Sequence, residues 1–229
     1  MPKSIVYYTD HNLPSDLADL CAAQLNRAAG GLEIVTVGLN KPADFGNENI
    51  TLSGVRGVLT MHYQILAGLE KARGDVVFMA EHDVLYHPSH FVFEPERRDT
   101  FYYNVHVWHA RYPDGFSVFY DAQQVSGLCA SRALLLEYYT KRIGQLKADG
   151  FNRHYEPGLH QTVGGQLVQD WFSEYPNIDV RHGENLTPSK WSPGDFRNPR
   201  YARGWRESDT VPGWGRPADV FAKGVITWH

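Results

Sequence analysis

Short apolar runs alternate with amphipathic stretches over the first half of the chain. Residues 4–9 and 32–37 are rich in β-branched and aromatic side chains, which is typical of strands. Hydrophobic side chains recur at helical spacing over residues 15–28 and again over residues 58–69. Residues 75–80 are almost wholly apolar, as in a strand covered on both faces. This order predicts an α/β fold with a mixed, mainly parallel sheet flanked by helices.

The pattern becomes less regular after residue 95. Residues 101–108 and 116–120 resemble strands on either side of a Pro113-Asp114-Gly115 turn, which predicts an antiparallel insertion. The polar, Asn- and Gly-rich residues 38–54 are expected to form a loop. Further along, the pattern favours, in order, a helix over residues 130–147, a polar loop, a helix that ends near residue 174 and a strand over residues 178–181.

Regular periodicity disappears beyond residue 182. Five of the 13 prolines and four of the six tryptophans lie in this last part of the chain. Such a density of aromatic side chains favours a packed, irregular tail over a disordered one. We therefore expect one domain over residues 1–187 and a C-terminal lid or tail over residues 188–229, packed on the same domain.

Composition narrows the class of protein further. A chain of 229 residues with 42% hydrophobic side chains can bury a core without disulfides, and two cysteines are too few for a disulfide framework. No apolar run approaches the ~20 residues of a membrane helix, and the first residues do not resemble a secretory signal. The expected protein is soluble and cytoplasmic, with no membrane partner. Its net charge of -4 argues against a nucleic-acid coat protein or a membrane-surface protein.

Several common motifs are missing. The sequence has no G-x-x-x-x-G-K-[ST] phosphate loop, no G-x-G-x-x-G after the first expected strand and no G-x-S-x-G elbow. It also has no C-x-x-C pair for structural zinc. A zinc site made by His87, His90, His106 and His109 ranks low, because residues 104–108 resemble a strand, in which positions i and i+3 face opposite ways.

The strongest chemical motif follows the apolar strand at residues 75–80. Glu81-His82-Asp83 comes directly after it, and open α/β sheets bind ligands outside the carboxyl ends of their strands. Two acids separated by one residue in a turn can point toward one site, with Asp83 holding a divalent cation and Glu81 beside it. Such a cation suits a diphosphate, because it neutralises charge as the diphosphate leaves. The alternative is a solvated acidic turn after a core strand.

This motif and its surroundings resemble the GT-A-fold glycosyltransferases, with Glu81 in place of the first Asp of their D-x-D motif. The resemblance covers about residues 4–190 and rests on Val6-Tyr7-Tyr8-Thr9-Asp10, Arg56, the helix His62-Tyr63-Gln64-Ile65-Leu66-Ala67-Gly68-Leu69, Val76-Val77-Phe78-Met79-Ala80-Glu81-His82-Asp83 and Val180-Arg181-His182. It implies a Rossmann-like GT-A fold, a nucleotide-diphosphate sugar donor (a UDP-sugar is favoured) and Mn²⁺ or Mg²⁺ as cofactor.

The resemblance also implies roles for individual residues. The metal ligands would be Asp83, His182 and Glu81. The donor would contact Thr9, Asp10, Arg56, Gln64 and His82. An inverting enzyme needs a general base for the acceptor hydroxyl, and the family places an acid where Glu156 stands, with Asp170 and Asp121 as the alternatives.

Two further regions are candidates for substrate contacts. The small residues around Ser126-Gly127 are expected to open a helix and admit an acceptor close to the backbone, or else to form a tight packed turn. The tail interleaves basic and aromatic residues, which can hold phosphates and stack a base or a sugar. Lys190 and Trp191 would close over the donor diphosphate, and the expected acceptor contacts are Arg197, Arg200 and Trp205. The alternative is a tail that wraps the domain with its tryptophans buried.

Together these features predict a metal-dependent glycosyltransferase. The chain is similar to the small phage-type glycosyltransferases related to the base J glucosyltransferase family, which implies a 5-hydroxymethylpyrimidine in DNA as the acceptor and an enzyme of the host cytoplasm. A duplex base would have to be flipped out to reach a buried donor. The alternatives are transfer to a saccharide or lipid, a nucleotidyltransferase, and a non-catalytic module that binds nucleic acid or nucleotides.

Overall fold

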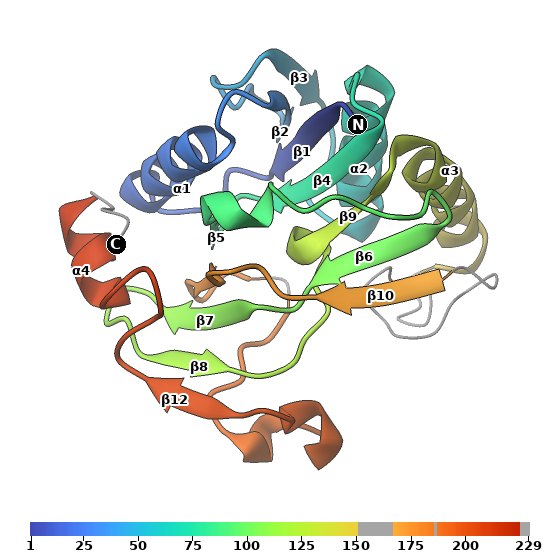
Figure 1. The fold of residues 1–229 in the computed structure, drawn as a ribbon. Helices are drawn as coiled ribbons and strands as arrows, with labels where there is room; N and C mark the ends of the chain where they lie inside the picture. The colour runs from blue at the N-terminus through green and yellow to red at the C-terminus, as the bar shows by residue number, and fades with distance from the viewer. Residues whose placement is uncertain (151–166, 186, 225–229) are drawn as a thin grey trace.

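The structure is a computed structural model that describes residues 1–150, 167–185 and 187–224. Its first sheet has the strand order β10-β6-β9-β4-β1-β2-β3 (Figure 1). These strands span Lys3–Thr9 (β1), Glu33–Leu39 (β2), Glu48–Leu52 (β3), Val76–Glu81 (β4), Thr100–Asn104 (β6), Leu128–Ser131 (β9) and Leu167–Trp171 (β10). Every pairing in this sheet is parallel except those of β9. The predicted mixed, mainly parallel sheet is confirmed.

A second, smaller sheet has the strand order β12-β8-β7-β11-β5. Its strands span Val84–Leu85 (β5), Val107–Arg111 (β7), Ser117–Phe119 (β8), Asn177–Arg181 (β11) and Arg206–Ser208 (β12). Strands β7 and β8 pair antiparallel around the Pro113-Asp114-Gly115 turn, as the sequence predicts. Strand β12 pairs antiparallel with β8, so the C-terminal tail contributes a strand to this sheet.

Helices cover both faces of the first sheet. They are Ser15–Ala28 (α1), Val58–Lys71 (α2) and Arg132–Asp149 (α3), whereas the short helix Pro217–Lys223 (α4) packs through Val220 on the core of the second sheet. Apolar side chains of α2 and α3 pack on one face of the sheet, whereas Leu25 and Ala28 of α1 pack on the other (Figure 1). None of the described helices has the length and hydropathy that a membrane span requires.

Helix α1 also contacts the second sheet. Its Leu17 and Cys21 join a core with Trp108 of β7 and Ile178 of β11. The tail adds Trp214 to the same core, and the Trp214 Nε1 group donates a hydrogen bond to the carbonyl of Pro176 at 2.7 Å. The two sheets are therefore joined by shared apolar packing, and part of the aromatic tail is core.

Strand β10 replaces the helix expected to end near residue 174. The segment pairs in parallel with β6, and its Trp171 ring stacks on Phe93 at 4.2 Å between centroids. The edge of β6 offers backbone groups that a strand satisfies, and this pairing outweighs the weak helical pattern. Asp170 consequently lies on an exposed edge strand rather than within a helix.

Three other boundaries differ from the expected ones. Part of the expected loop over residues 38–54 is the edge strand β3, whose Ile50 and Leu52 pack on the core while their neighbours are exposed. The expected strand over residues 101–108 is split between β6 and β7, which belong to different sheets. Ser126 and Gly127 lie in the short turn Val125–Gly127 before β9, so they do not open α3.

Buried histidines give the fold a predictable sensitivity to acid. His90 is fully buried and accepts a hydrogen bond from Asn104 at 2.9 Å, and burial lowers the pKa of its imidazole to about 3. Below about pH 6.5 the unfolded chain binds a proton that the folded chain does not, so stability falls as the pH drops from 6.5 toward the folded pKa. The unfolding temperature of a His90→Phe variant should therefore fall less steeply over this range than that of the wild type. Parallel slopes would contradict this role of His90.

Candidate functional site

The turn Glu81-His82-Asp83 lies where the two sheets meet. It follows β4 of the first sheet and leads directly into β5 of the second. Strand β1 pairs with β4 in parallel, so Thr9 at the end of β1 and Asp10 directly after it lie beside this turn. The carboxyl ends of the two central strands thus form one edge, which is where ligands bind in open α/β sheets.

The pairing of β11 with β5 brings His182 to the turn. Asp179 is opposite Val84 in this antiparallel pair, so residues after Asp179 run back along the residues before Val84. The backbone N–H of Val180 donates to the carbonyl of Asp83 at 2.7 Å. Residues separated by about a hundred positions in the sequence are therefore held together by backbone hydrogen bonds.

His82, Asp83 and His182 form a group that can hold a metal ion. Their ligand atoms all lie within 4.8 Å of one another. His182 Nε2 lies 3.6 Å from Asp83 Oδ2, and the His182 side chain is only 2% exposed. Neither ring nitrogen of His182 has a hydrogen-bond partner among the described residues. Buried imidazole nitrogens that lack hydrogen-bond partners and lie next to a carboxylate are typical of a site that binds a metal ion.

The surroundings of Asp83 keep its carboxyl group ionised. Burial by itself would raise its pKa, but His182, His82 and Arg181 together hold the pKa below its usual value. Asn185 Nδ2 also donates to Asp83 Oδ2 at 2.8 Å. An ionised carboxylate at this position is ready to bind a cation without losing a proton.

Glu81 lies beside this group but points elsewhere. Alternate residues of β4 share a face, so Glu81 follows Met79 toward the side of the sheet covered by α2 and α3. There it accepts a hydrogen bond from the Tyr8 hydroxyl at 2.6 Å. Burial, and then repulsion by Asp83, raise the pKa of Glu81 to about 8. The two acids of the motif thus have different environments, contrary to the expectation that both point toward one site.

Five of the seven residues expected to contact the donor, all except Lys190 and Trp191, lie around the same edge. Thr9 Oγ1 is 2.8 Å from His82 Nδ1, and Gln64 Nε2 donates to the Thr9 carbonyl at 2.8 Å. Arg56 Nε donates to Asp10 Oδ2 at 2.5 Å. Burial would raise the pKa of Asp10, but the Arg56 hydrogen bond and His82 hold it below its usual value.

Arg56 also fixes the loop that follows His182. Its Nη2 group donates to the carbonyl of Glu184 at 3.0 Å, while its Nε is bound to Asp10. The Arg56 side chain is 40% exposed, so the guanidinium remains accessible to an anion from solvent. It therefore provides positive charge at the mouth of the site.

A buried polar network behind the metal group was not foreseen from the sequence. Asp179 accepts hydrogen bonds from Gln124 at 2.7 Å and from Arg181 at 3.3 Å, and His109 Nε2 lies 3.7 Å from its carboxylate. Asp179 and Arg181 are both buried and stand two residues apart on β11. Two charged residues at alternate positions of an apolar strand were the available signal, because such a pair is buried only when its members satisfy each other.

Arg181 connects this network to the start of the tail. Its Nε donates to Ser189 Oγ at 3.1 Å, and its Nη2 donates to the carbonyl of Thr187. Lys190 follows next in the chain, and Trp191 packs near Arg111 and Phe116 of the β7–β8 hairpin. The described contacts of the Trp191 ring are therefore with this hairpin, and its backbone N–H donates to Asp195 Oδ2 at 2.7 Å.

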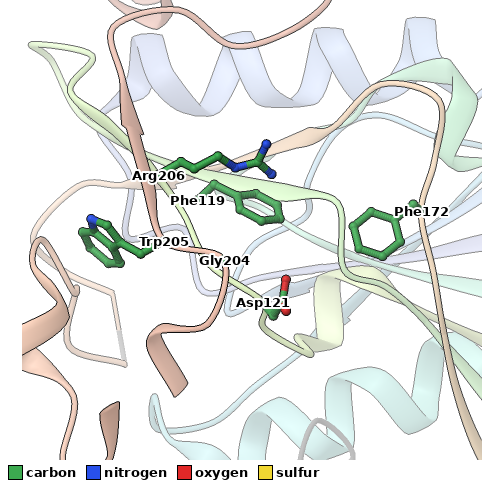
Figure 2. A pocket seen from close by; sticks show the side chains of 6 residues that line it. All are labelled: Phe119, Asp121, Phe172, Gly204, Trp205 and Arg206. Carbon is green, nitrogen blue, oxygen red and sulfur yellow. The ribbon is translucent and has the colours of Figure 1, made fainter. Parts of the chain in front are cut away.

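A pocket of about 540 Å³ lies beside the tail. Figure 2 shows Trp205 and Phe172 at opposite ends of its lining, with Asp121 between them. The Arg206 guanidinium lies 4.4 Å from the centre of the Phe119 ring, and Phe172 is 61% exposed. The lining residues are Phe119, Asp121, Phe172, Gly204, Trp205 and Arg206. Aromatic rings, a carboxylate and a guanidinium suit a polar ring-shaped ligand.

The three candidate catalytic acids occupy different places. Asp121 is exposed and lines the pocket. Asp170 accepts a hydrogen bond from Gln123 at 2.6 Å on the edge strand β10. Glu156 lies outside the described residues. Arg197 and Arg200, two expected acceptor contacts, are exposed on the tail.

Ser126 and Gly127 occupy a packed turn. Both are buried, and the Ser126 carbonyl accepts a hydrogen bond from the Tyr86 hydroxyl at 3.2 Å. A Cβ atom at Gly127 would lie 2.5 Å from the carbonyl oxygen of Asn104. The tight packed turn, which was one of the two expectations for this segment, agrees with this environment.

Gly127→Ala is expected to destabilise the protein by about 1–3 kcal/mol, because the added methyl group overpacks the turn. Gly144 of α3 is the matched control, since a Cβ there meets no atom within 4 Å. Gly144→Ala should raise stability by about 0.5–1 kcal/mol through helix propensity. Urea unfolding of both variants measures the difference in the free energy of unfolding. Equal values for the two variants would show that the Gly127 turn accommodates a methyl group without loss of stability.

The rival histidine cluster does not assemble. The only group of metal-ligating side chains found in residues 1–150, 167–185 and 187–224 is His82, Asp83 and His182. The four histidines of the rival site have separate environments: His87 contacts Ser89, His90 contacts Asn104, His106 contacts Ser173, and His109 lies near Asp179.

Comparison with known proteins supports the fold. No family model and no curated protein matches the chain. The inositol-1-phosphate CTP transferase from T. maritima has a TM-score of 0.51 at 12% identity, over 82% of this chain and 92% of that one. The apo-form glycosyltransferase GlyE of Streptococcus pneumoniae TIGR4 has a TM-score of 0.39 at 12% identity, over 69% and 41%. The likeness to the inositol-1-phosphate CTP transferase shows the α/β fold, a mostly parallel sheet flanked by helices.

Proposed function

We propose that this protein is a metal-dependent glycosyltransferase that uses a nucleotide-diphosphate sugar, with a UDP-sugar favoured. The observation that carries the proposal is the group His82, Asp83 and His182, placed beside Asp10 and Arg56 at the carboxyl edge of β1 and β4. In this proposal residues 1–187 form the catalytic domain and residues 188–229 its lid.

Five residues around the site have roles in the proposed reaction. Asp83 and His182 would hold the cation, which supplies charge neutralisation on the donor diphosphate. Asp10 and Thr9 line the strand end where the nucleoside would lie, and Asp10 offers an acceptor for its hydroxyl groups. Arg56 offers a guanidinium to the phosphates, which it binds better than a lysine because its donors form a fork.

The aromatic pocket supports a ring-shaped acceptor. Trp205 and Phe172 offer faces on which a nucleobase or sugar would stack, and Asp121, which lines the same pocket, is one candidate for the base that takes the proton of an acceptor hydroxyl. Glu156 and Asp170 remain the other candidates for this base. Deprotonation of the acceptor hydroxyl lets its oxygen attack the anomeric carbon as the bond to the diphosphate breaks.

The proposed acceptor is a 5-hydroxymethylpyrimidine in DNA. The resemblance to small phage-type DNA glycosyltransferases supports it, and so does the row of exposed arginines along the tail sequence, Arg197, Arg200, Arg203 and Arg206, of which Arg206 lines the pocket. Such a row can bind successive phosphates even in a chain whose net charge is -4. A saccharide or lipid acceptor would need the pocket but not the arginines.

An acceptor screen tests this function. The protein is incubated with UDP-, GDP-, CDP- and TDP-glucose and Mn²⁺, together with hydroxymethylated DNA, unmodified DNA or an oligosaccharide, and products are identified by mass spectrometry. Sugar on hydroxymethylated DNA alone is the expected result. Transfer only to the oligosaccharide would contradict the DNA acceptor. In a parallel incubation with CTP or UTP and a sugar phosphate, release of pyrophosphate would instead identify a nucleotidyltransferase, provided that the first screen shows no sugar transfer.

A further inference from the structure

His82 has one ring nitrogen occupied and the other available. Its Nδ1 lies 2.8 Å from Thr9 Oγ1 and 3.5 Å from Asp10 Oδ1. Thr9 Oγ1 accepts a hydrogen bond from the backbone N–H of His11 at 2.9 Å and has a second lone pair that can accept from Nδ1, while the Asp10 carboxylate can only accept. These neighbours favour the tautomer with the proton on Nδ1, which leaves the lone pair of Nε2 for a ligand. Metal-binding histidines are commonly oriented in this way.

Glu81 is engaged within the fold instead. Tyr8 and Glu81 are register partners in the β1–β4 pair, and the Tyr8 hydroxyl donates to the Glu81 carboxylate at 2.6 Å. The backbone N–H of Glu81 donates to the Tyr86 hydroxyl at 3.0 Å. Two tyrosine hydroxyls thus hold the first acid of the motif, and its carboxylate does not belong to the group of His82, Asp83 and His182.

The remaining donor atoms are two imidazoles and one carboxylate. The His182 side chain is 98% buried, and both of its nitrogens lack hydrogen-bond partners among the described residues, so it is ready to bind an ion. Mg²⁺ and Ca²⁺ prefer sites made of oxygen ligands. Imidazole nitrogen suits the later first-row metals, and affinity at nitrogen sites rises from Mn²⁺ through Co²⁺.

We propose that His82, and not Glu81, is the third ligand of a two-histidine, one-carboxylate site that selects first-row transition metals and discriminates against Mg²⁺. The inference rests on the proposed function only in that it concerns the same metal site. Thr9 and Asp10 act in it as positioning residues, because they hold Nδ1 of His82 and so aim Nε2 at the ion.

Metal titrations without donor or acceptor test the inference. Mn²⁺ binding is followed by electron paramagnetic resonance and Co²⁺ binding by visible absorption, with Mg²⁺ as a competitor; a second series contains UDP. The wild type should bind Mn²⁺ and Co²⁺ more tightly than Mg²⁺ by over about tenfold. His82→Gln should weaken Mn²⁺ binding by about 10–100-fold, whereas the matched variant Glu81→Gln should stay close to the wild type.

Two further variants probe selectivity and positioning. His82→Asp replaces an imidazole with a carboxylate, so it should lower the ratio of Mn²⁺ affinity to Mg²⁺ affinity. Thr9→Val should weaken Co²⁺ binding and shift its absorption spectrum, and Thr9→Ser should restore both. A purely structural role of Thr9 would leave the spectrum of bound Co²⁺ unchanged.

The outcomes separate this inference from the proposed function. Equal affinity for Mg²⁺ and Mn²⁺ overturns it, as does loss of Mn²⁺ binding in Glu81→Gln but not in His82→Gln. No Mn²⁺ or Co²⁺ binding in either series overturns it too. Sugar transfer that runs equally well with Mg²⁺ keeps the function and contradicts the inference. Tight Mn²⁺ binding through His82 without sugar transfer to any acceptor supports the inference and contradicts the proposed function.

Discussion

Asp83→Asn is expected to lower sugar transfer by at least about 100-fold while the protein remains folded, since losing a ligand costs more than losing its supporting hydrogen bonds. Asparagine has the same shape and can still accept the hydrogen bond from Asn185. It lacks the negative charge that would bind the cation between His82 and His182. Steady-state kinetics with Mn²⁺ measures the rate of sugar transfer, and circular dichroism shows whether the variant is folded.

Asp114→Asn is the matched control for this variant. Asp114 is an exposed carboxylate that pairs with Arg111 at 2.6 Å, and it has no contact with the metal group. Exposed pairs of this kind contribute little to stability, so activity and folding should both stay near the wild type. Full activity of Asp83→Asn would remove Asp83 from the reaction, and equal losses in both variants would point to a general effect of charge.

Trp205→Ala should raise the KM for the acceptor by about tenfold or more, because stacking of one base on an aromatic ring is worth about 1–3 kcal/mol. Trp205 lines the 540 Å³ pocket, and its ring stacks on Tyr120 with an angle of 5° between the planes. Hydrolysis of the donor in the absence of acceptor should not change. Initial rates at a series of acceptor concentrations measure the effect.

Tyr201→Ala provides the comparison for Trp205. Tyr201 is also an aromatic residue of the tail and is 57% exposed, but it does not line the pocket. Its removal should leave the KM for the acceptor nearly unchanged. If Tyr201→Ala raises this KM as much as Trp205→Ala, the acceptor binds the surface of the tail rather than the pocket.

The central elements of the fold could be predicted because their patterns are strong. The apolar residues of β4 and the helical stripe of α2 are signals that local sequence determines, and both elements form as expected. Edge strands were missed, since β3 and β10 bury only one face and their polar residues mimic a loop or a helix. The division of residues 101–108 between two sheets depends on long-range pairing, which periodicity does not encode.

The site was predictable in its members more than in their arrangement. Position after β4 was enough to select Asp83, and the family resemblance led to Asp10, Arg56 and His182, which lie around the same edge. The spacing of Glu81-His82-Asp83 could not show that Glu81 faces Tyr8, because this depends on the register of β1 against β4. The charged pair on β11 was missed for a similar reason, since its other partners, such as Gln124 and His109, come from distant segments of the chain.

The central claim is that Asp83 and its two histidines hold a cation on the diphosphate of a sugar nucleotide. Thermal unfolding of the wild type and of Asp83→Asn with UDP-, GDP-, CDP- and TDP-sugars, each with and without Mn²⁺, tests it most directly. A donor at about 100 times its Kd should add about 2.7 kcal/mol of stability. We predict that one donor stabilises the wild type only with Mn²⁺ and has no effect on Asp83→Asn. No shift with any donor, or an equal shift in both proteins, would contradict the claim.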